Sequence, residues 1–253
     1  VTTYVNKVIS YEANSYNSAW FKNALFITER ADGAIPDNWC TIYQNAQTVD
    51  LAGFSIKKLY YSGNPCGVTT DPVTASNINT AINDGKGFVC YFDHGAIDGW
   101  SSYRIADVGG LANAARLPVV IGIACDTSHF VNGPPYHPYM DMSGTHHTGT
   151  DNGEVFFSIA PRPANTQVMV SDNPESFGEY ITVKTPNGAI AYVGSMTGAQ
   201  YFGGYLAEGF FEGYHASFGT PTLGNVWNYA IWHYYKDHPA PATINPVNWV
   251  TLA

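Results

Sequence analysis

Five short apolar runs, each bounded by turn residues, recur along the chain and predict buried strands. They are residues 24–28 (ALFIT), 55–61 (SIKKLYY), 87–92 (GFVCYF), 118–124 (PVVIGIA) and 189–195 (AIAYVGS). Continuous apolarity, rather than alternation with polar residues, is typical of strands buried on both faces of a parallel sheet.

Helical patterns fill the segments between these runs. Residues 38–53 fit a helix closed by Gly53, and the segment 74–85 fits a helix with Thr74 or Ser76 as its N-cap and Gly85 at its end. Strands that alternate with helices predict an α/β domain, whose mainly parallel sheet is covered by helices on both faces.

Two further helices are predicted towards the C-terminal end. Residues 205–219 have helical spacing, and residues 220–239 begin with the start signal Thr220 and Pro221. The apolar stripe of this last helix consists of Leu223, Val226, Trp227, Ala230, Ile231 and Tyr234.

Residues 131–174 break this rhythm. The segment is rich in Pro, Gly, Thr and His, with β-like pieces at 154–160 and 166–170. We interpret it as a long insertion, a β-hairpin excursion within a single domain that covers residues 1–253. Loops of this length in compact domains are usually functional or disordered, and a lid or inhibitory loop next to the active site is one hypothesis.

Charge excludes one class of partner. The formal net charge is −9, with 11 Lys plus Arg and no basic run, so the electrostatic footprint of a nucleic-acid-binding protein is missing. No apolar stretch has the roughly 18 to 20 residues that a membrane-spanning helix needs.

The chain contains 4 cysteines without CxxC spacing. Cys40 and Cys66 lie in polar surroundings and could pair, whereas Cys90 and Cys125 lie in apolar strands.

Two of the predicted strands end in residues that can perform chemistry. His94 and Cys125 each come one or two residues after a buried strand. The carboxyl ends of parallel strands form one edge of the sheet, where ligands bind, so neighbouring strands would bring imidazole and thiol together. An imidazole can supply the base or cation that a thiol needs to ionise, and the amides of Gly95 and Cys125 could stabilise an oxyanion. A buried core cysteine and a structural histidine are the alternative interpretation.

The sequence around these residues resembles the gingipain family of cysteine peptidases, peptidase family C25 of the caspase-like clan CD. The resemblance lies in residues 5–33, 76–100, 116–130 and 175–201, with the His-Gly and Ala-Cys motifs each after an apolar strand. It implies a caspase-like three-layer sandwich and a secreted or cell-surface bacterial thiol protease, which acts on protein or peptide substrates through an acyl-enzyme.

The resemblance also implies roles for individual residues. Cys125 is expected to be the nucleophile, His94 the group that protonates the leaving amine, and the Gly95 and Cys125 amides the oxyanion site. An acidic residue after the first strand orients the histidine in the family, and here Asp32, or the less well aligned Glu29, is the candidate.

Substrate binding is where the sequence departs from the family pattern. Arginine-specific members have an aspartate at the base of the specificity pocket, and Cys40 takes that position here. Tyr201, with Tyr205 one turn on, matches the aromatic pocket wall. We therefore expect a preference that is not securely for arginine and that favours an uncharged or small P1 residue. Family members also carry flanking domains, which are absent from this chain.

Metal binding is a separate question. No cofactor is required for the expected chemistry, although the family often binds structural calcium at loop carboxylates. The insertion contains His137, Asp141, His146, His147 and Asp151, whose spacing matches no established zinc pattern. Two alternatives to the peptidase thus remain: a catalytically silent caspase-like module for binding or adhesion, and a metal-dependent hydrolase built on the insertion.

Overall fold

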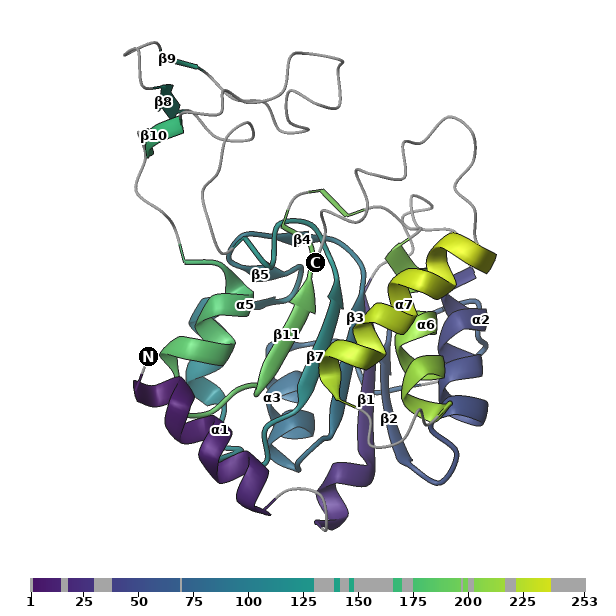
Figure 1. The fold of residues 1–253 in the computed structure, drawn as a ribbon. Helices are drawn as coiled ribbons and strands as arrows, with labels where there is room; N and C mark the ends of the chain where they lie inside the picture. Colours follow the sequence, from purple (N-terminus) through teal and green to yellow (C-terminus); the bar gives the residue numbers. More distant parts are fainter. Residues whose placement is uncertain are drawn as a thin grey trace.

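The computed structural model describes residues 2–14, 18–29, 38–68, 70–129, 139–141, 146–147, 166–169, 175–196, 198–199, 203–216 and 222–237. Five parallel strands in the order β11-β7-β3-β1-β2 form the central sheet (Figure 1). They are β1 (Asn23–Thr28), β2 (Ser55–Tyr60), β3 (Phe88–Phe92), β7 (Val119–Ile123) and β11 (Ala191–Gly194). All five predicted strands are therefore confirmed, and every pairing between them is parallel.

Helices cover both faces of this sheet, as the three-layer caspase-like fold requires (Figure 1). One face packs against α2 (Asn38–Asn45), α6 (Gly204–His215) and α7 (Leu223–Asp237), and the other against α3 (Ala75–Asn83) and the segment α5 (Phe177–Glu179) with η4 (Tyr180–Lys184). The strands supply both cores by alternation. Phe26 and Cys90 face the first layer, whereas Leu25 and Val89 face the second.

Local signals explain the helix ends. Thr74 is the N-cap of α3 because its hydroxyl accepts a hydrogen bond from the Asn77 amide, and Gly85 follows the helix with φ of 87°. The predicted helix 38–53 is present as α2 followed by a π-helical turn, η2 (Ala46–Asp50), before Gly53 at φ of 87°. Thr220 and Pro221 lie outside the described residues.

The apolar stripe predicted for the last helix is correct only in part. Val226, Ala230 and Tyr234 are buried, and Trp227 also packs against the core. Leu223, however, is 39% exposed, so the stripe is not buried at the first residue of α7.

Helix α1 (Thr2–Asn14) is tied to the second layer by a buried lysine. The Lys7 ammonium donates hydrogen bonds to the carbonyl oxygens of Ile181, Thr182 and Ala189 at 3.1, 2.9 and 3.1 Å. Burial lowers the pKa of Lys7 to about 8. The first two of these carbonyls lie in η4 and the third lies between η4 and β11, so Lys7 joins the beginning of the chain to the segment that leads into the edge strand.

Short elements complete the described structure. η1 (Ala19–Lys22) precedes β1, and η3 (Ile105–Gly110) precedes β7. A small antiparallel sheet of β4 (Gly95–Ala96), β5 (Gly99–Trp100) and β6 (Tyr103–Arg104) follows β3 directly. In the insertion, β8 (Tyr139–Asp141), β9 (His146–His147) and β10 (Thr166–Met169) form another antiparallel sheet. The predicted β-like piece at 154–160 lies outside the described residues.

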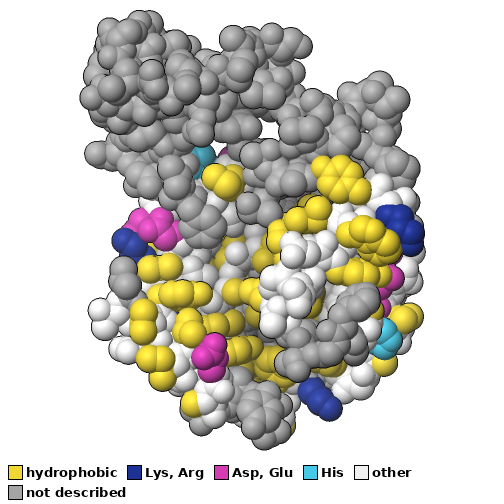
Figure 2. All heavy atoms as spheres, viewed as in Figure 1, with side chains coloured by type: hydrophobic (Ala, Val, Ile, Leu, Met, Phe, Trp, Pro, Cys, Tyr) yellow, Lys and Arg dark blue, Asp and Glu magenta, His cyan; other side chains and the backbone are white. Residues whose placement is uncertain are grey.

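Apolar side chains reach the surface on the face formed by α1, β11 and α7 (Figure 2). On α1, Ile9 is 62% exposed, and on α7, Trp232 is 48% exposed. None of the helices in the described ranges is long and apolar enough to cross a membrane.

Candidate active site

The register of the sheet places His94 and Cys125 at the same level. Phe92 of β3 pairs with Ile123 of β7, so each of the two candidate residues lies two positions beyond the last paired residue of its strand. The pairing extends one step further, because the Asp93 amide donates to the carbonyl of Ile123 at 3.2 Å. Adjacent parallel strands are about 4.8 Å apart, so both residues leave the same edge of the sheet as near neighbours.

Gly95 packs directly against the segment that carries Cys125. A Cβ atom added at Gly95 would lie 2.7 Å from the Ala124 Cβ, 2.9 Å from the Cys125 carbonyl oxygen and 2.9 Å from the Thr127 Cγ2. No side chain larger than hydrogen fits there without displacing the neighbouring strand end. The two predicted motifs, His94-Gly95 and Ala124-Cys125, are thus in contact.

The sulfur of Cys125 interacts with backbone groups. Its thiol donates to the Ala199 carbonyl at 3.5 Å, and the Ala199 amide donates to the sulfur at 3.2 Å. Burial is the largest influence on the pKa of Cys125 and raises it, and the nearby charge of Asp126 raises it further. The amides of Ala199, Cys125 and Gly95 act in the opposite direction, because an N–H that points at the sulfur favours the thiolate.

Asp93 is a buried carboxylate that fixes the backbone before His94. It is 4% exposed, and its Oδ1 accepts a hydrogen bond from the His94 amide at 2.6 Å. Its Oδ2 accepts from the Glu29 amide at 2.9 Å, which joins the ends of β3 and β1. Asp93 was not among the site residues expected from the sequence, although a carboxylate at the end of a fully apolar strand is the signal that marks it.

Two hydroxyl groups hold the other side of the His94 backbone. The Tyr91 hydroxyl donates to the His94 carbonyl at 2.7 Å, and the Ser101 hydroxyl donates to the same oxygen at 3.3 Å. Ser101 lies in the turn between β5 and β6, so the small sheet after β3 serves to hold the histidine loop in place.

Glu29 follows β1 immediately and is the acidic residue that the structure places near this network. Burial raises the pKa of Glu29, Ser102 lowers it by hydrogen bonding, and the nearby Asp93 carboxylate adds to the rise. Asp32, the better aligned candidate, lies outside the described residues, so its role stays a prediction.

Glu29 also lines a cavity of about 450 Å³ at the ends of β1 and β2, together with Tyr61 and Val68. Another cavity, of about 360 Å³, lies at the opposite edge of the sheet beside Lys57 and Lys86. Only the first is on the edge that carries His94 and Cys125, so only the first is relevant to the candidate site.

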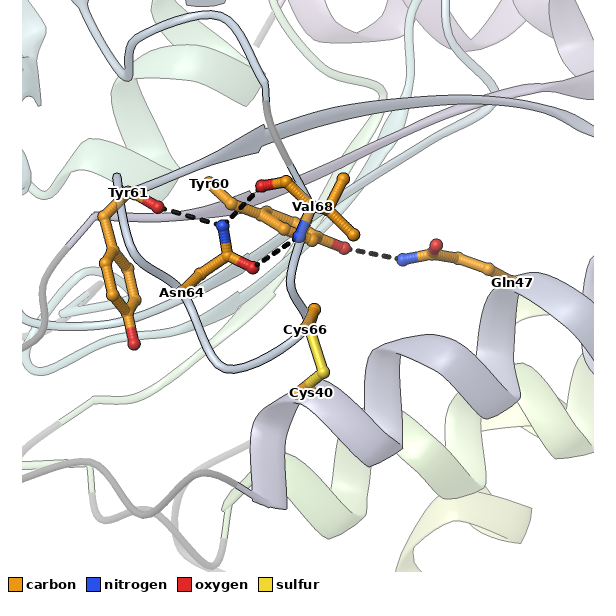
Figure 3. Close-up of a disulfide and its surroundings, with 7 residues drawn as sticks. All are labelled: Cys40, Gln47, Tyr60, Tyr61, Asn64, Cys66 and Val68. Carbon is orange, nitrogen blue, oxygen red and sulfur yellow. Dashed lines mark hydrogen bonds between the residues drawn. A yellow bond between two sulfur atoms is a disulfide. The ribbon is translucent and has the colours of Figure 1, made fainter.

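The loop that borders this cavity is fixed by a disulfide and an asparagine (Figure 3). Cys40 of α2 is bonded to Cys66, and the Asn64 side chain donates to the carbonyls of Tyr61 and Val68 at 3.0 and 2.6 Å. The pairing that the sequence left open is therefore present. Cys40 is 7% exposed, and its expected place at the base of a specificity pocket stays a prediction.

The remaining expectations lie at the margin of the described structure. Tyr205 is partly buried on α6, whereas Tyr201 lies outside the described residues, as do His137 and Asp151. Asp141 belongs to β8, and His146 and His147 form β9. Across the described ranges, no group of three or more His, Cys, Asp or Glu residues is arranged to hold a metal ion. His137 and Asp151 are not among those ranges, so the calcium or zinc ion considered from the sequence stays a prediction.

A parallel α/β sheet with a His-Gly and an Ala-Cys segment in contact at its carboxyl edge defines a caspase-like cysteine peptidase fold. The comparisons with known proteins agree. The model of peptidase family C25 matches residues 1–252, and the chain belongs to this family.

Solved structures share the fold at low sequence identity. The Arg-specific cysteine proteinase gingipain R (RgpB) superposes with a TM-score of 0.64 and 18% identity, over 99% of this chain and 50% of that one. A chain in the complex of the Porphyromonas gingivalis RgpB pro- and mature domains superposes with a TM-score of 0.61 and 19% identity, over 94% of this chain and 48% of that one. This chain thus spans about half the length of these relatives. No curated protein matches the sequence significantly.

Proposed function

We propose that this chain is a cysteine endopeptidase domain that hydrolyses peptide bonds through Cys125 and His94. The observation that carries the proposal is the contact of Gly95 with the Ala124-Cys125 segment in a register that sets His94 and Cys125 level. Family membership supports the same chemistry, and the amide donors around the sulfur favour a thiolate.

The proposed reaction has two stages. The Cys125 thiolate attacks the scissile carbonyl carbon, and the amides of Gly95 and Cys125 bind the resulting oxyanion. His94 gives a proton to the leaving amine as the C–N bond breaks, which leaves an acyl-enzyme. Water then attacks the thioester, His94 takes one of its protons, and the carboxylate product leaves as the thiol returns to Cys125.

Hydrogen bonds fix the backbone of the residue that is proposed to act as the acid. The carboxylate of Asp93 holds the His94 amide, while Tyr91 and Ser101 hold its carbonyl. Glu29 and Asp32 are the two candidates for a group that orients the imidazole. The contribution of such a group is to keep a reactive geometry, in which a shift of about 1 Å costs roughly a hundredfold in rate.

Protein or peptide substrates and a secreted or cell-surface location complete the proposal. The Cys40–Cys66 disulfide supports the location, because disulfides persist in oxidising compartments. The solved relative is described as Arg-specific. For this chain we propose a preference that does not depend on arginine, because Cys40 takes the sequence position of the aspartate and is already bonded to Cys66. Cleavage of a fluorogenic panel only after Arg would refute this part.

A binding module without activity is the second candidate function. It is favoured by one observation: burial raises the pKa of Cys125, and the sulfur is engaged by the backbone of Ala199. Such a thiol would need a cationic partner before it could react.

The rate at which an irreversible peptidyl electrophile labels Cys125 tests both candidates. We expect fast labelling of the wild type and a large loss in His94→Ala, with no change in His215→Ala, which removes an exposed histidine on α6. Cys90 is fully buried and serves as the internal control for unfolding. Equally slow labelling in wild type and His94→Ala would reject the peptidase and leave the binding module.

A further inference from the structure

The residue after the candidate nucleophile has an unusual backbone conformation. Asp126 has φ of 59°, in the left-handed region, and in the described part of the chain Ala114 is the other non-glycine residue with positive φ. This conformation is costly for most L-residues and is tolerated best by Gly, Asn and Asp. Strain of this kind persists where the surrounding structure imposes it, often at functional sites.

Hydrogen bonds on both sides of Asp126 hold its backbone in this left-handed conformation. The Thr127 hydroxyl donates to the carbonyl of Ala124 at 3.2 Å, and the His129 amide donates to the carbonyl of Asp126 at 3.2 Å. The turn is also attached to its surroundings, because the Ser128 amide donates to the carbonyl of Ser195 at 2.8 Å. The chain therefore reverses sharply just after Cys125, with Thr127, Ser128 and His129 buried.

The conformation alone would permit glycine or asparagine, but this chain has aspartate. Of the three residues that tolerate the left-handed region, only aspartate adds a negative charge beside the thiol. That charge acts against the amides of Ala199, Gly95 and Cys125, which favour the thiolate. Conformation and charge are thus separable properties of one residue.

We propose that Asp126 is a positioning residue for Cys125 with two effects: its left-handed backbone fixes the turn that holds the Cys125 segment against Gly95, and its carboxylate, on the residue next to the thiol, opposes a second negative charge there. The consequence is a nucleophile that depends on a cationic imidazole, His94, to become reactive. A thiol kept protonated is also less open to oxidation, because the thiolate is the reactive species. This consequence rests on the proposed function, whereas the two effects themselves do not.

Other titratable groups surround the same turn. His94 and the buried Asp93 lie at the end of β3, Glu29 lies beyond them at the end of β1, and His129 is on the turn itself. Asp93 and Glu29 thus bring carboxyl groups, and His94 and His129 imidazoles, to the neighbourhood of this turn. A test must therefore change Asp126 without changing these groups.

Substitution by asparagine and by alanine separates the two effects. Asp126→Asn removes the charge and keeps a residue that tolerates the left-handed region. Asp126→Ala also removes the charge, but it places a residue there for which the left-handed region is more costly. Iodoacetamide labelling of Cys125 is followed from pH 5 to 9, because this small reagent needs no peptidase activity. Thermal unfolding is measured on the same samples, and Ala114→Gly serves as the control for relief of strain elsewhere.

We expect Asp126→Asn to be labelled several-fold faster than the wild type near neutral pH, with a ratio of the two rates that narrows as the pH rises and the wild-type thiol begins to ionise. Its unfolding midpoint should equal that of the wild type, whereas Asp126→Ala should unfold at a lower temperature. Ala114→Gly should raise the midpoint and leave the labelling profile unchanged. The labelling of Asp126→Asn is also measured in a His94→Ala background. Asp126→Asn should still be labelled faster there, even if His94 has no catalytic role, so failure of the proposed peptidase function can be distinguished from failure of the inference about Asp126.

Two results would overturn the inference. Labelling of Asp126→Asn that matches the wild type at every pH would show that the carboxylate does not restrain the thiol. An Asp126→Ala variant as stable as Asp126→Asn would show that the left-handed conformation is not required.

Discussion

Replacement of Gly95 by alanine is the sharpest test of the contact between the two candidate strand ends. The added methyl group would lie 2.7 Å from the Ala124 Cβ and 2.9 Å from the Cys125 carbonyl oxygen. Favourable carbon–carbon contacts begin at about 3.5 Å, so the segments must separate by roughly 1 Å. The Gly95 amide is retained, and the substitution therefore tests packing rather than the loss of an oxyanion donor.

The expected magnitude follows from this displacement. Overpacking in a tight site costs about 1 to 3 kcal/mol of unfolding free energy. A shift of about 1 Å between the groups that act on the substrate lowers the rate roughly a hundredfold. We expect Gly95→Ala to lose about 2 kcal/mol in urea unfolding and to label Cys125 with a peptidyl electrophile about a hundredfold more slowly.

A matched glycine provides the control for this substitution. A Cβ atom at Gly109 in η3 meets no atom within 4 Å, so Gly109→Ala should leave labelling unchanged and stability equal or slightly higher. If Gly95→Ala kept both the stability and the labelling rate of the wild type, the close packing of the two strand ends, and the site built on it, would be refuted.

Three further predictions concern stability. Replacement of Cys40 and Cys66 by serine opens a loop of 26 residues and should lower the unfolding free energy by about 3.5 kcal/mol. Urea unfolding of the variant, and of the wild type with and without reductant, measures this loss, and equal unfolding midpoints would contradict it. Burial, more than the nearby charges, raises the pKa of Asp50 to about 6, so the folded state binds its proton more tightly than the unfolded chain and loses stability as the pH rises from 4 to 6. The stability of Asp50→Asn relative to the wild type should grow over this range, and a pH-independent difference would reject the shift. Lys7→Met leaves three carbonyls without their donor and should cost at least about 2 kcal/mol in thermal unfolding, which an unchanged midpoint would disprove.

The central sheet could be predicted because its strands are buried on both faces. A run such as 87–92 has no polar position until Asp93, and a helix of that composition would be too short to stand alone. The small sheet β4-β5-β6 could not be predicted, since strands of two residues have no periodicity to detect. The π-helical turns likewise have no sequence signal that separates them from the helices they continue.

Within the site, residues with distinctive chemistry could be predicted and backbone contacts could not. His94 and Cys125 were expected because each follows an apolar strand, and parallel strands end at a common edge. The contact between Cys125 and Ala199 spans 74 residues and involves only the backbone of Ala199, so no residue type marks it. The conformation of Asp126 depends on hydrogen bonds to Ser195 and other distant groups, which only the folded chain brings together.

The ionisation of Cys125 is where these contacts become relevant to activity. Amides of Ala199, Gly95 and Cys125 lower the pKa of the thiol, but burial and Asp126 raise it, and burial is the largest of these influences. Amide donors therefore do not by themselves make this thiol a nucleophile near neutral pH. The proposed peptidase reaction therefore requires a positive charge near the sulfur. His94 is the candidate for it, because it lies two residues beyond Phe92 as Cys125 lies two residues beyond Ile123. Reactivity of Cys125 should thus depend on His94 far more than it would for an exposed thiol at a helix N-terminus, where the peptide dipoles alone can stabilise the thiolate.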